Sequence, residues 1–118
     1  MDIEQVREYC LGFKGVTEEL PFGPDVLVFK VMGKMFCLMP LTGEDKRISL
    51  KNTPEKNIEL RAEYDFIAGA YHMSKTHWNS VDLRSPVKIS LLNELIRESY
   101  DLVAAGLTKK LKEELNAL

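Results

Sequence analysis

Cysteine and histidine are scarce in this sequence, whose 118 residues include two of each. Cys10 and Cys37 have no closely spaced partners of the kind that zinc sites and redox-active dithiols require. His72 and His77 have opposite parity if both lie on strands, so they are not expected to converge on one metal ion. We therefore expect two buried, reduced thiols and neither a metal nor a cofactor.

An excess of positive charge is also missing, because 16 Lys and Arg stand against 18 Asp and Glu, for a net charge of −2. This balance excludes the basic coat of many nucleic-acid-binding proteins. No apolar run approaches the roughly 18 residues of a membrane span, and the first residues lack the pattern of a signal peptide. We expect a cytoplasmic protein without a membrane partner.

Motifs that carry catalysis are absent as well. No glycine-rich phosphate loop follows a strand, and no nucleophile elbow or Ser/His/Asp or Cys/His grouping can be identified. The sequence therefore predicts a protein that binds and does not catalyse.

The apolar content of 45% and the length are typical of one globular domain spanning residues 1–118. Capping signals and 3.6-residue periodicity predict helices over 2–12, 53–64, 90–106 and from 108 onward. Alternating or β-branched segments predict strands over 17–20, 26–32, 35–39, 47–51, 67–73 and 77–83. This order predicts an α+β fold with a mainly antiparallel sheet and flanking N- and C-terminal helices.

Strand alternation assigns the side chains of the first hairpin to two faces. With Gly33-Lys34 as its two-residue turn, the expected core face holds Leu27, Phe29, Val31, Phe36 and Leu38. The expected outer face holds Val28, Lys30, Met32, Met35, Cys37 and Met39.

The outer face is expected to combine cations with an aromatic ring, and it contains Lys30, Arg47, Lys51, His72 and Trp78. His72 lies opposite Trp78 if the second hairpin has a three-residue loop. Such a surface can hold phosphates and stack a base. The alternative is that the cations only discourage edge pairing and that Trp78 is a packing residue.

Lysines crowd the start of the last helix, where Lys109, Lys110 and Lys112 follow Thr108. The helix dipole favours anions at this end, so an anion site is one interpretation. A solvated lysine face on a terminal amphipathic helix is the simpler one.

Several motifs together resemble those of the MmcQ/YjbR family of small bacterial proteins. They are Tyr71-His72-Met73-Ser74-Lys75-Thr76-His77-Trp78-Asn79, Pro21-Phe22-Gly23, Phe29-Lys30-Val31, Gly33-Lys34-Met35-Phe36, Leu50-Lys51, Ser99-Tyr100 and Leu107-Thr108-Lys109-Lys110-Leu111. The similarity spans nearly the whole chain. Two positions depart from it: Asn52-Thr53 replaces a frequent Cys-acid pair, and Thr108 replaces a frequent Pro, so no role for that cysteine carries over.

The resemblance implies a CyaY-like, frataxin-like fold and a DNA-binding role of a double-wing type. That role would use Lys30 and Lys34 in one wing and Lys75, His77 and Trp78 in the other. Weak, salt-dependent binding of DNA is our leading hypothesis from the sequence.

The alternative is a protein-interaction or small-ligand domain that uses an adaptable apolar surface around Met32, Met35, Met39 and Trp78. A frataxin-like metal binder is a third hypothesis, which the sparse acidic residues of the first helix disfavour.

Overall fold

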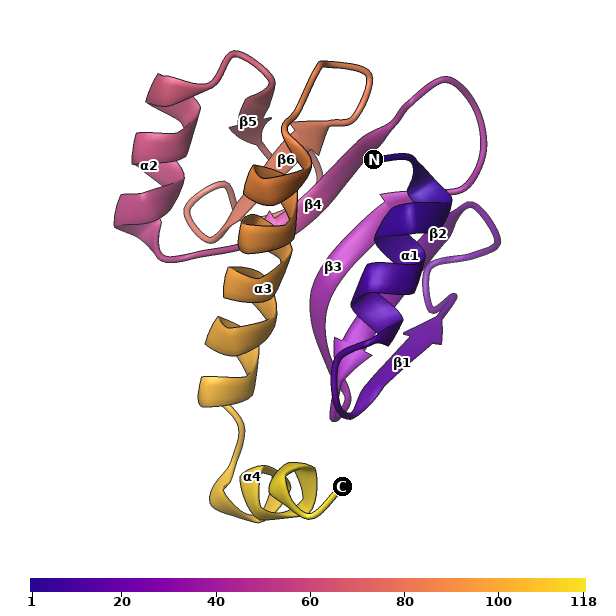
Figure 1. Cartoon of the computed structure of the whole chain (residues 1–118), viewed down its shortest axis with the longest axis vertical. Helices are drawn as coiled ribbons and strands as arrows, with labels where there is room; N and C mark the ends of the chain where they lie inside the picture. The colour runs from indigo at the N-terminus through magenta and orange to yellow at the C-terminus, as the bar shows by residue number, and fades with distance from the viewer.

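Six antiparallel strands form one sheet in the order β1-β2-β3-β4-β6-β5, as the computed structural model of all 118 residues shows (Figure 1). The strands are β1 (Val16–Glu19), β2 (Val26–Val31), β3 (Lys34–Pro40), β4 (Arg47–Lys51), β5 (Ile67–Gly69) and β6 (Trp78–Asp82). The helices are α1 (Ile3–Leu11), α2 (Pro54–Glu63), α3 (Ile89–Ala105) and α4 (Lys109–Asn116). The predicted antiparallel α+β fold with terminal helices is confirmed.

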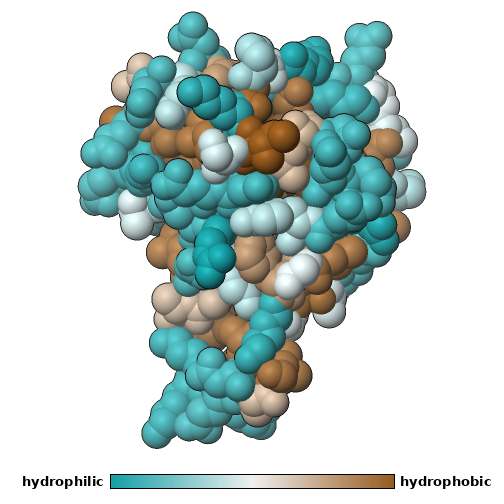
Figure 2. All heavy atoms as spheres, in the orientation of Figure 1, coloured by the Kyte–Doolittle hydropathy of each residue, from teal (hydrophilic) through white to brown (hydrophobic).

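Helices α1 and α3 lie over the same face of the sheet, and α2 lies beside β5 and β6 (Figure 1). α4 lies at the end of the molecule away from α2. The opposite face of the sheet, called the outer face below, carries no helix. Seen from the helix side, hydrophilic residues cover most of α2 and α4, with apolar atoms showing between them (Figure 2).

Three of the four helices begin with the side-chain caps that the sequence predicts. Asp2 and Gln5 form a reciprocal capping box at α1, and the Thr53 and Thr108 hydroxyls accept bonds from backbone N–H groups of α2 and α4. The prediction for α3 is wrong: Lys88, without a side-chain bond, is its N-cap, and Ser90 lies inside the helix.

The β2–β3 hairpin differs from the prediction in its turn and its register. Met32 and Gly33, with φ of 48° and 86°, form the turn between the paired residues Val31 and Lys34. A bulge then shifts the register between Phe29 and Lys30. An extra residue in one strand reverses the faces of the residues beyond it.

The bulge corrects three face assignments. Cys37 pairs with Phe29 and Met39 pairs with Leu27, so both lie on the core face, where the sequence had placed neither. Leu38 pairs with Val28 and lies on the outer face instead of in the core. Met35 keeps its predicted outer position.

The core lies between the sheet and the helices that cover it. It contains 20 buried apolar residues, with Phe36 and Ile48 from the sheet and Leu92 and Ile96 from α3 fully buried. Both thiols are free and buried, as expected, and a hydrogen bond with Cys10 together with burial raises the pKa of Cys37 well above its usual value. No helix has the length and apolar character needed to cross a membrane.

Candidate ligand-binding site

A ladder of side chains crosses the outer face of the sheet from β2 to β6. Val28 pairs with Leu38, Leu38 with Ser49, and Ser49 with Ser80. Because residues directly opposite each other point to the same side, these four line up on the face without helices. The result is an apolar half on β2 and β3 and a hydroxyl-bearing half on β4 and β6.

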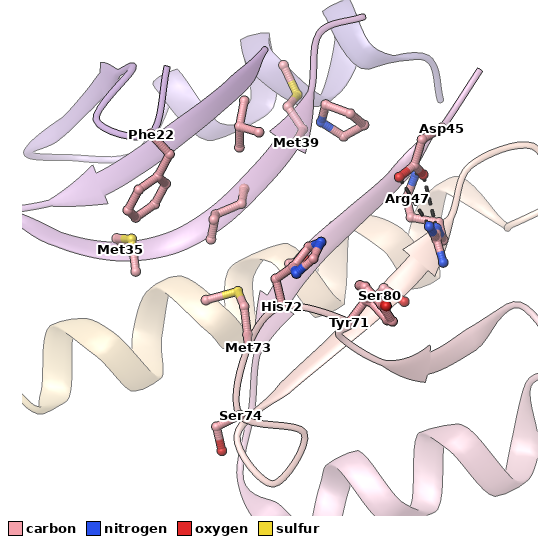
Figure 3. A pocket seen from close by; sticks show the side chains of 14 residues that line it. Phe22, Met35, Met39, Asp45, Arg47, Tyr71, His72, Met73, Ser74 and Ser80 are labelled. Carbon is pink, nitrogen blue, oxygen red and sulfur yellow. Dashed lines mark hydrogen bonds and ion pairs between the residues drawn. The ribbon is translucent and has the colours of Figure 1, made fainter. Parts of the chain in front are cut away.

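Two loops rise beside this ladder and flank an open pocket of about 630 Å³ (Figure 3). One is the turn after β1, which carries Phe22. The other is the segment 70–77 between β5 and β6, which carries Tyr71, His72 and Met73. The volume lies in the range typical of sites for small organic molecules.

The pocket has an apolar end and a polar end. Phe22 and Met35 lie at one end in Figure 3, Asp45 and Arg47 lie at the other, and His72 lies between them. Half of the 14 lining residues are hydrophobic. The full lining is Phe22, Val26, Met35, Leu38, Met39, Pro40, Asp45, Arg47, Ser49, Tyr71, His72, Met73, Ser74 and Ser80.

The charges at the polar end are neutralised within the chain. Arg47 donates from Nε to Oδ1 of Asp45 at 3.0 Å and from Nη2 to Oδ2 at 3.2 Å. These bonds and a third from the Arg47 backbone N–H lower the pKa of Asp45. Asp82, which pairs with Arg47 across the sheet, is held in the same way by Arg84, and its pKa is also lowered.

The loop 70–77 is fixed from the α2 side by a partly buried polar network. Arg61 donates from Nη1 to the carbonyl of Lys75 at 2.6 Å and to Oδ1 of Asn79 at 3.0 Å. Asn57, which is fully buried, donates from Nδ2 to the carbonyl of Thr76 at 3.1 Å. Side chains of α2 therefore hold the loop that forms one wall of the pocket.

The strands of the second hairpin, β5 and β6, are shorter than predicted, and the loop between them is longer. His72 therefore lies in the loop and not on a strand. The N–H of Ala70 donates to the carbonyl of Trp78, so Ala70 occupies the place that the sequence assigned to His72. The expectation that His72 lies opposite Trp78 is wrong. His72 instead lies in the loop at the pocket, and His77 is exposed near the end of the same loop.

Strand pairing places the remaining sheet residues of the predicted cationic surface on the outer face. Thr17 pairs with Lys30, Arg47 with Asp82, and Lys51 with Trp78. Lys30 is ion-paired with Glu19 at 3.2 Å, and Arg47 is paired with Asp45. Carboxylates thus divide the cations of this face, and only Arg47 of them lines the pocket.

Trp78 is a packing residue on this outer face, with 7% of its surface exposed. Nζ of Lys51 lies 6.0 Å from the centre of its ring, and Nζ of Lys75 lies 5.8 Å from that of Tyr71. Neither lysine forms an ion pair. Contacts of this kind are cation–π interactions.

The other predicted cations do not line the pocket. Lys34 is exposed beside the β2–β3 turn, and Lys109 and Lys110 are exposed at the start of α4. α4 is at the opposite end of the molecule from α2 and β5 (Figure 1). The structure therefore keeps Lys109 and Lys110 apart from the 70–77 loop. No three His, Cys, Asp or Glu side chains are grouped so that they could hold a metal ion.

Sequence reasoning missed most of the pocket. It singled out Met35 and Met39 as parts of an apolar surface, and both line it, but Met32 and Trp78 do not. Phe22, Tyr71 and Met73 lie on loops, where strand alternation does not predict which way a side chain points. The available signal was aromatic residues in turns, since Phe22 and Tyr71 are 62% and 73% exposed.

Comparisons with known proteins find relatives over nearly the whole chain. The family model described as YjbR matches residues 11–102. The protein is 40% identical over 107 residues to "Uncharacterized protein YbdF" of Escherichia coli O157:H7, covering 91% of this chain and 88% of the relative. It is 25% identical over 100 residues to "Uncharacterized protein YjbR" of Escherichia coli K12, covering 85% of each.

Two solved structures have the same fold. The crystal structure of Deinococcus radiodurans protein DR2400, described as a DUF419 domain, superposes with a TM-score of 0.89 at 39% identity, covering 98% of this chain and 88% of that one. A crystal structure of a Pseudomonas syringae protein superposes with a TM-score of 0.74 at 28% identity, covering 86% and 98%.

Proposed function

This chain belongs to the YjbR family, and we propose that it is a non-catalytic, cytoplasmic domain that binds a small organic molecule in the pocket on the outer face of its sheet. The observation that carries the proposal is the pocket of about 630 Å³ with one apolar and one polar end. Concave sites with mixed lining of this size are typical of small-molecule ligands.

The lining chemistry supports ligand binding over protein docking. Phe22 and Tyr71 are largely exposed although they are large aromatic residues, and covering them with a ligand would remove apolar surface from water. Met35 and Met73 supply flexible side chains that adapt to different shapes. A small molecule can reach all of these groups at once, whereas a flat protein surface cannot enter the hollow.

A pocket-filling variant tests this function. Ser49 is half-buried in the floor of the pocket, so Ser49→Trp would occupy the space. We expect hits from a fragment screen, followed by ligand-observed NMR, to bind the wild type and to lose binding in this variant. Thr17→Trp is the matched control, because Thr17 lies on the same face of the sheet but outside the pocket. Fragments that bind both variants equally, or no binding fragments at all, would refute the proposal.

DNA binding is the second candidate, favoured by Lys51 and Lys75. Each lies over an aromatic ring and has no carboxylate partner. Cations beside aromatic rings support binding of phosphates and bases, and the family resemblance implies the same role with a CyaY-like fold. The ion pairs of Lys30 and Arg47 weigh against a continuous positive surface. We therefore prefer small-molecule binding in the pocket to DNA binding as the proposed function.

Fluorescence anisotropy with duplex and single-stranded DNA tests this second candidate. If DNA binds, affinity should fall steeply with salt, and removing Lys51 and Lys75 should each lower the salt slope by about one unit. Lys30→Ala is the control, because Lys30 is already neutralised by Glu19. Absence of binding at low salt would exclude DNA as a partner.

A further inference from the structure

We propose, on the basis of the ligand-binding role above, that the pocket selects an uncharged, planar aromatic molecule with an amide-like group at one end. The inference depends on three features of the pocket: the soft side chains of its apolar end, the cancelled charges near its polar end, and the hydrogen-bonding groups that remain unused there. Each feature narrows the class of ligand.

The apolar end favours an aromatic body. Phe22 and Met35 form this end, with Met73 reaching toward it from the 70–77 loop (Figure 3). Thioether sulfur makes favourable contacts with aromatic rings, and two aromatic rings gain additional stability from stacked or edge-to-face packing. A flat ring system can meet Phe22 and the methionines together, whereas a saturated body of the same size lacks the electrostatic part of these contacts.

The charges around the pocket favour a neutral ligand. Asp45 and Arg47, which line it, form a two-bond ion pair. Asp82 and Arg84, which adjoin Arg47, form another. The two pairs sum to zero, and the remaining titratable groups in the lining are His72 and Tyr71. A charged ligand would lose its hydration at the pocket without meeting an unpaired opposite charge.

The unused hydrogen-bonding groups fit an amide. Arg47 donates to Asp45 from Nε and Nη2, so its Nη1 is free to donate to a carbonyl oxygen. The Ser49 hydroxyl has no partner within the chain, and Ser80 has only a long bond of 3.5 Å to Ala68. Ser49 or Ser80 can therefore accept from an amide N–H. An amide carries both a carbonyl and an N–H. It can therefore accept from Nη1 of Arg47 and donate to the hydroxyl of Ser49 or Ser80.

Isothermal titration with four related compounds tests the ligand class. Indole-3-acetamide is neutral and planar, indole-3-acetate is anionic, tryptamine is cationic, and cyclohexylacetamide has the amide without the aromatic ring. We expect the wild type to bind indole-3-acetamide at least about tenfold more tightly than each of the other three, because each loses at least one matched interaction.

Two variants connect the preference to the polar end. Arg47→Lys keeps the positive charge but loses the planar fork, and we expect it to reduce the advantage of the acetamide over the acetate at least about threefold. Arg84→Lys is the control, because Arg84 is paired with Asp82 but does not line the pocket; it should leave the preference unchanged. An equal effect of both variants would contradict the role of Arg47.

The outcomes separate this inference from the proposed function. If fragments bind in the pocket but the acetate, tryptamine or cyclohexyl compound binds as tightly as indole-3-acetamide, the ligand class is wrong and the binding function stands. The same holds if fragments bind and none of the four compounds does. If Ser49→Trp blocks no fragment, the binding function itself fails.

Discussion

Gly15 lies where the turn after α1 packs closely against helix α4. It lies in the turn between α1 and β1 with φ of +73°, a conformation that other residues adopt with strain. A Cβ atom at this position would lie 2.6 Å from Cδ1 of Leu115 in α4 and 3.2 Å from the sulfur of Met32. A side chain at this position would force Leu115 of the last helix to shift.

Replacing Gly15 with alanine should therefore destabilise the protein by two separable effects. Gly15→Ala is expected to cost roughly 2–4 kcal/mol, the sum of left-handed backbone strain and overpacking against α4. Gly43→Ala is the control, since Gly43 has φ of +76° but open space around it, and it should cost only about 1 kcal/mol. Urea unfolding measures both. Equal costs would contradict the packing effect.

At the scale of elements, the 70–77 loop depends on helix α2. The loop joins two short strands and carries Tyr71, His72 and Met73 to the pocket. Arg61 and Asn57 bind its backbone carbonyls from α2, and the amide of Asn79 connects back to the carbonyl of Asn57 at 3.2 Å. The wall of the site is thus held by residues that do not themselves line it.

Weakening this network should loosen the loop selectively. Arg61→Lys removes at least one of two hydrogen bonds, at a cost of about 1 kcal/mol, and should speed amide exchange at His77 and Trp78 by up to about tenfold. Both amides donate to the carbonyl of Ser74 within the loop. Hydrogen exchange followed by NMR measures the change.

The control for this measurement is Arg97→Lys, which alters an exposed arginine whose only ion pair is with Asp101 at 3.8 Å. It should leave the exchange of the loop amides unchanged. Exchange rates at His77 and Trp78 that do not respond to Arg61→Lys would show that the loop is held by other contacts.

Elements with local signals could be predicted from the sequence, and those set by distant contacts could not. The caps Asp2, Thr53 and Thr108 predict the starts of their helices because the capping bonds join residues close in the sequence. The bulge at Phe29/Lys30 has no such signal, so alternation assigned Cys37, Leu38 and Met39 to the wrong faces. The sequence predicts a three-residue loop in this hairpin, whereas the structure has the longer loop 70–77. Side chains of α2 hold the backbone of this loop, and the local sequence does not reveal those contacts.

The candidate site was predictable only in part for the same reason. Lys30, Arg47, Lys51 and Trp78 lie on the outer face as alternation predicted. The neutralisation of Lys30 and Arg47 was not foreseen. Glu19 reaches Lys30 only because β1 pairs with β2, whereas the Asp45–Arg47 pair is local and alternation does not address it. The pocket formed by two loops over that face requires tertiary structure to be recognised.

At the scale of the whole molecule, the net charge of −2 conceals many local pairs. Glu18 forms a two-bond pair with Arg7, which joins β1 to α1, and hydrogen bonding to Arg7 lowers its pKa. The pKa values of Glu19, Asp45 and Asp82 are lowered as well. Carboxyls with lowered pKa values stabilise the fold above their unfolded pKa and lose that contribution as the pH falls through the folded one.

The protein should therefore lose stability below about pH 4, where carboxyls of the unfolded chain take up protons. Glu18→Gln removes one contributor, so it should lower the melting temperature at pH 7 by about 3–5 °C and narrow the difference between pH 7 and pH 3. Glu59→Gln is the control, since Glu59 is exposed and forms no ion pair. Thermal unfolding followed by circular dichroism checks this; identical pH profiles for both variants would contradict it.

The central claim is that the outer-face pocket binds a small molecule, and methyl NMR of the methionines tests it most directly. Met35, Met39 and Met73 line the pocket, whereas Met32 packs against the core and does not. Titration with a binding fragment should shift the methyl signals of Met35 and Met73 and leave that of Met32 unchanged. Shifts confined to Met32, or no shift at any of these methyls, would contradict the claim.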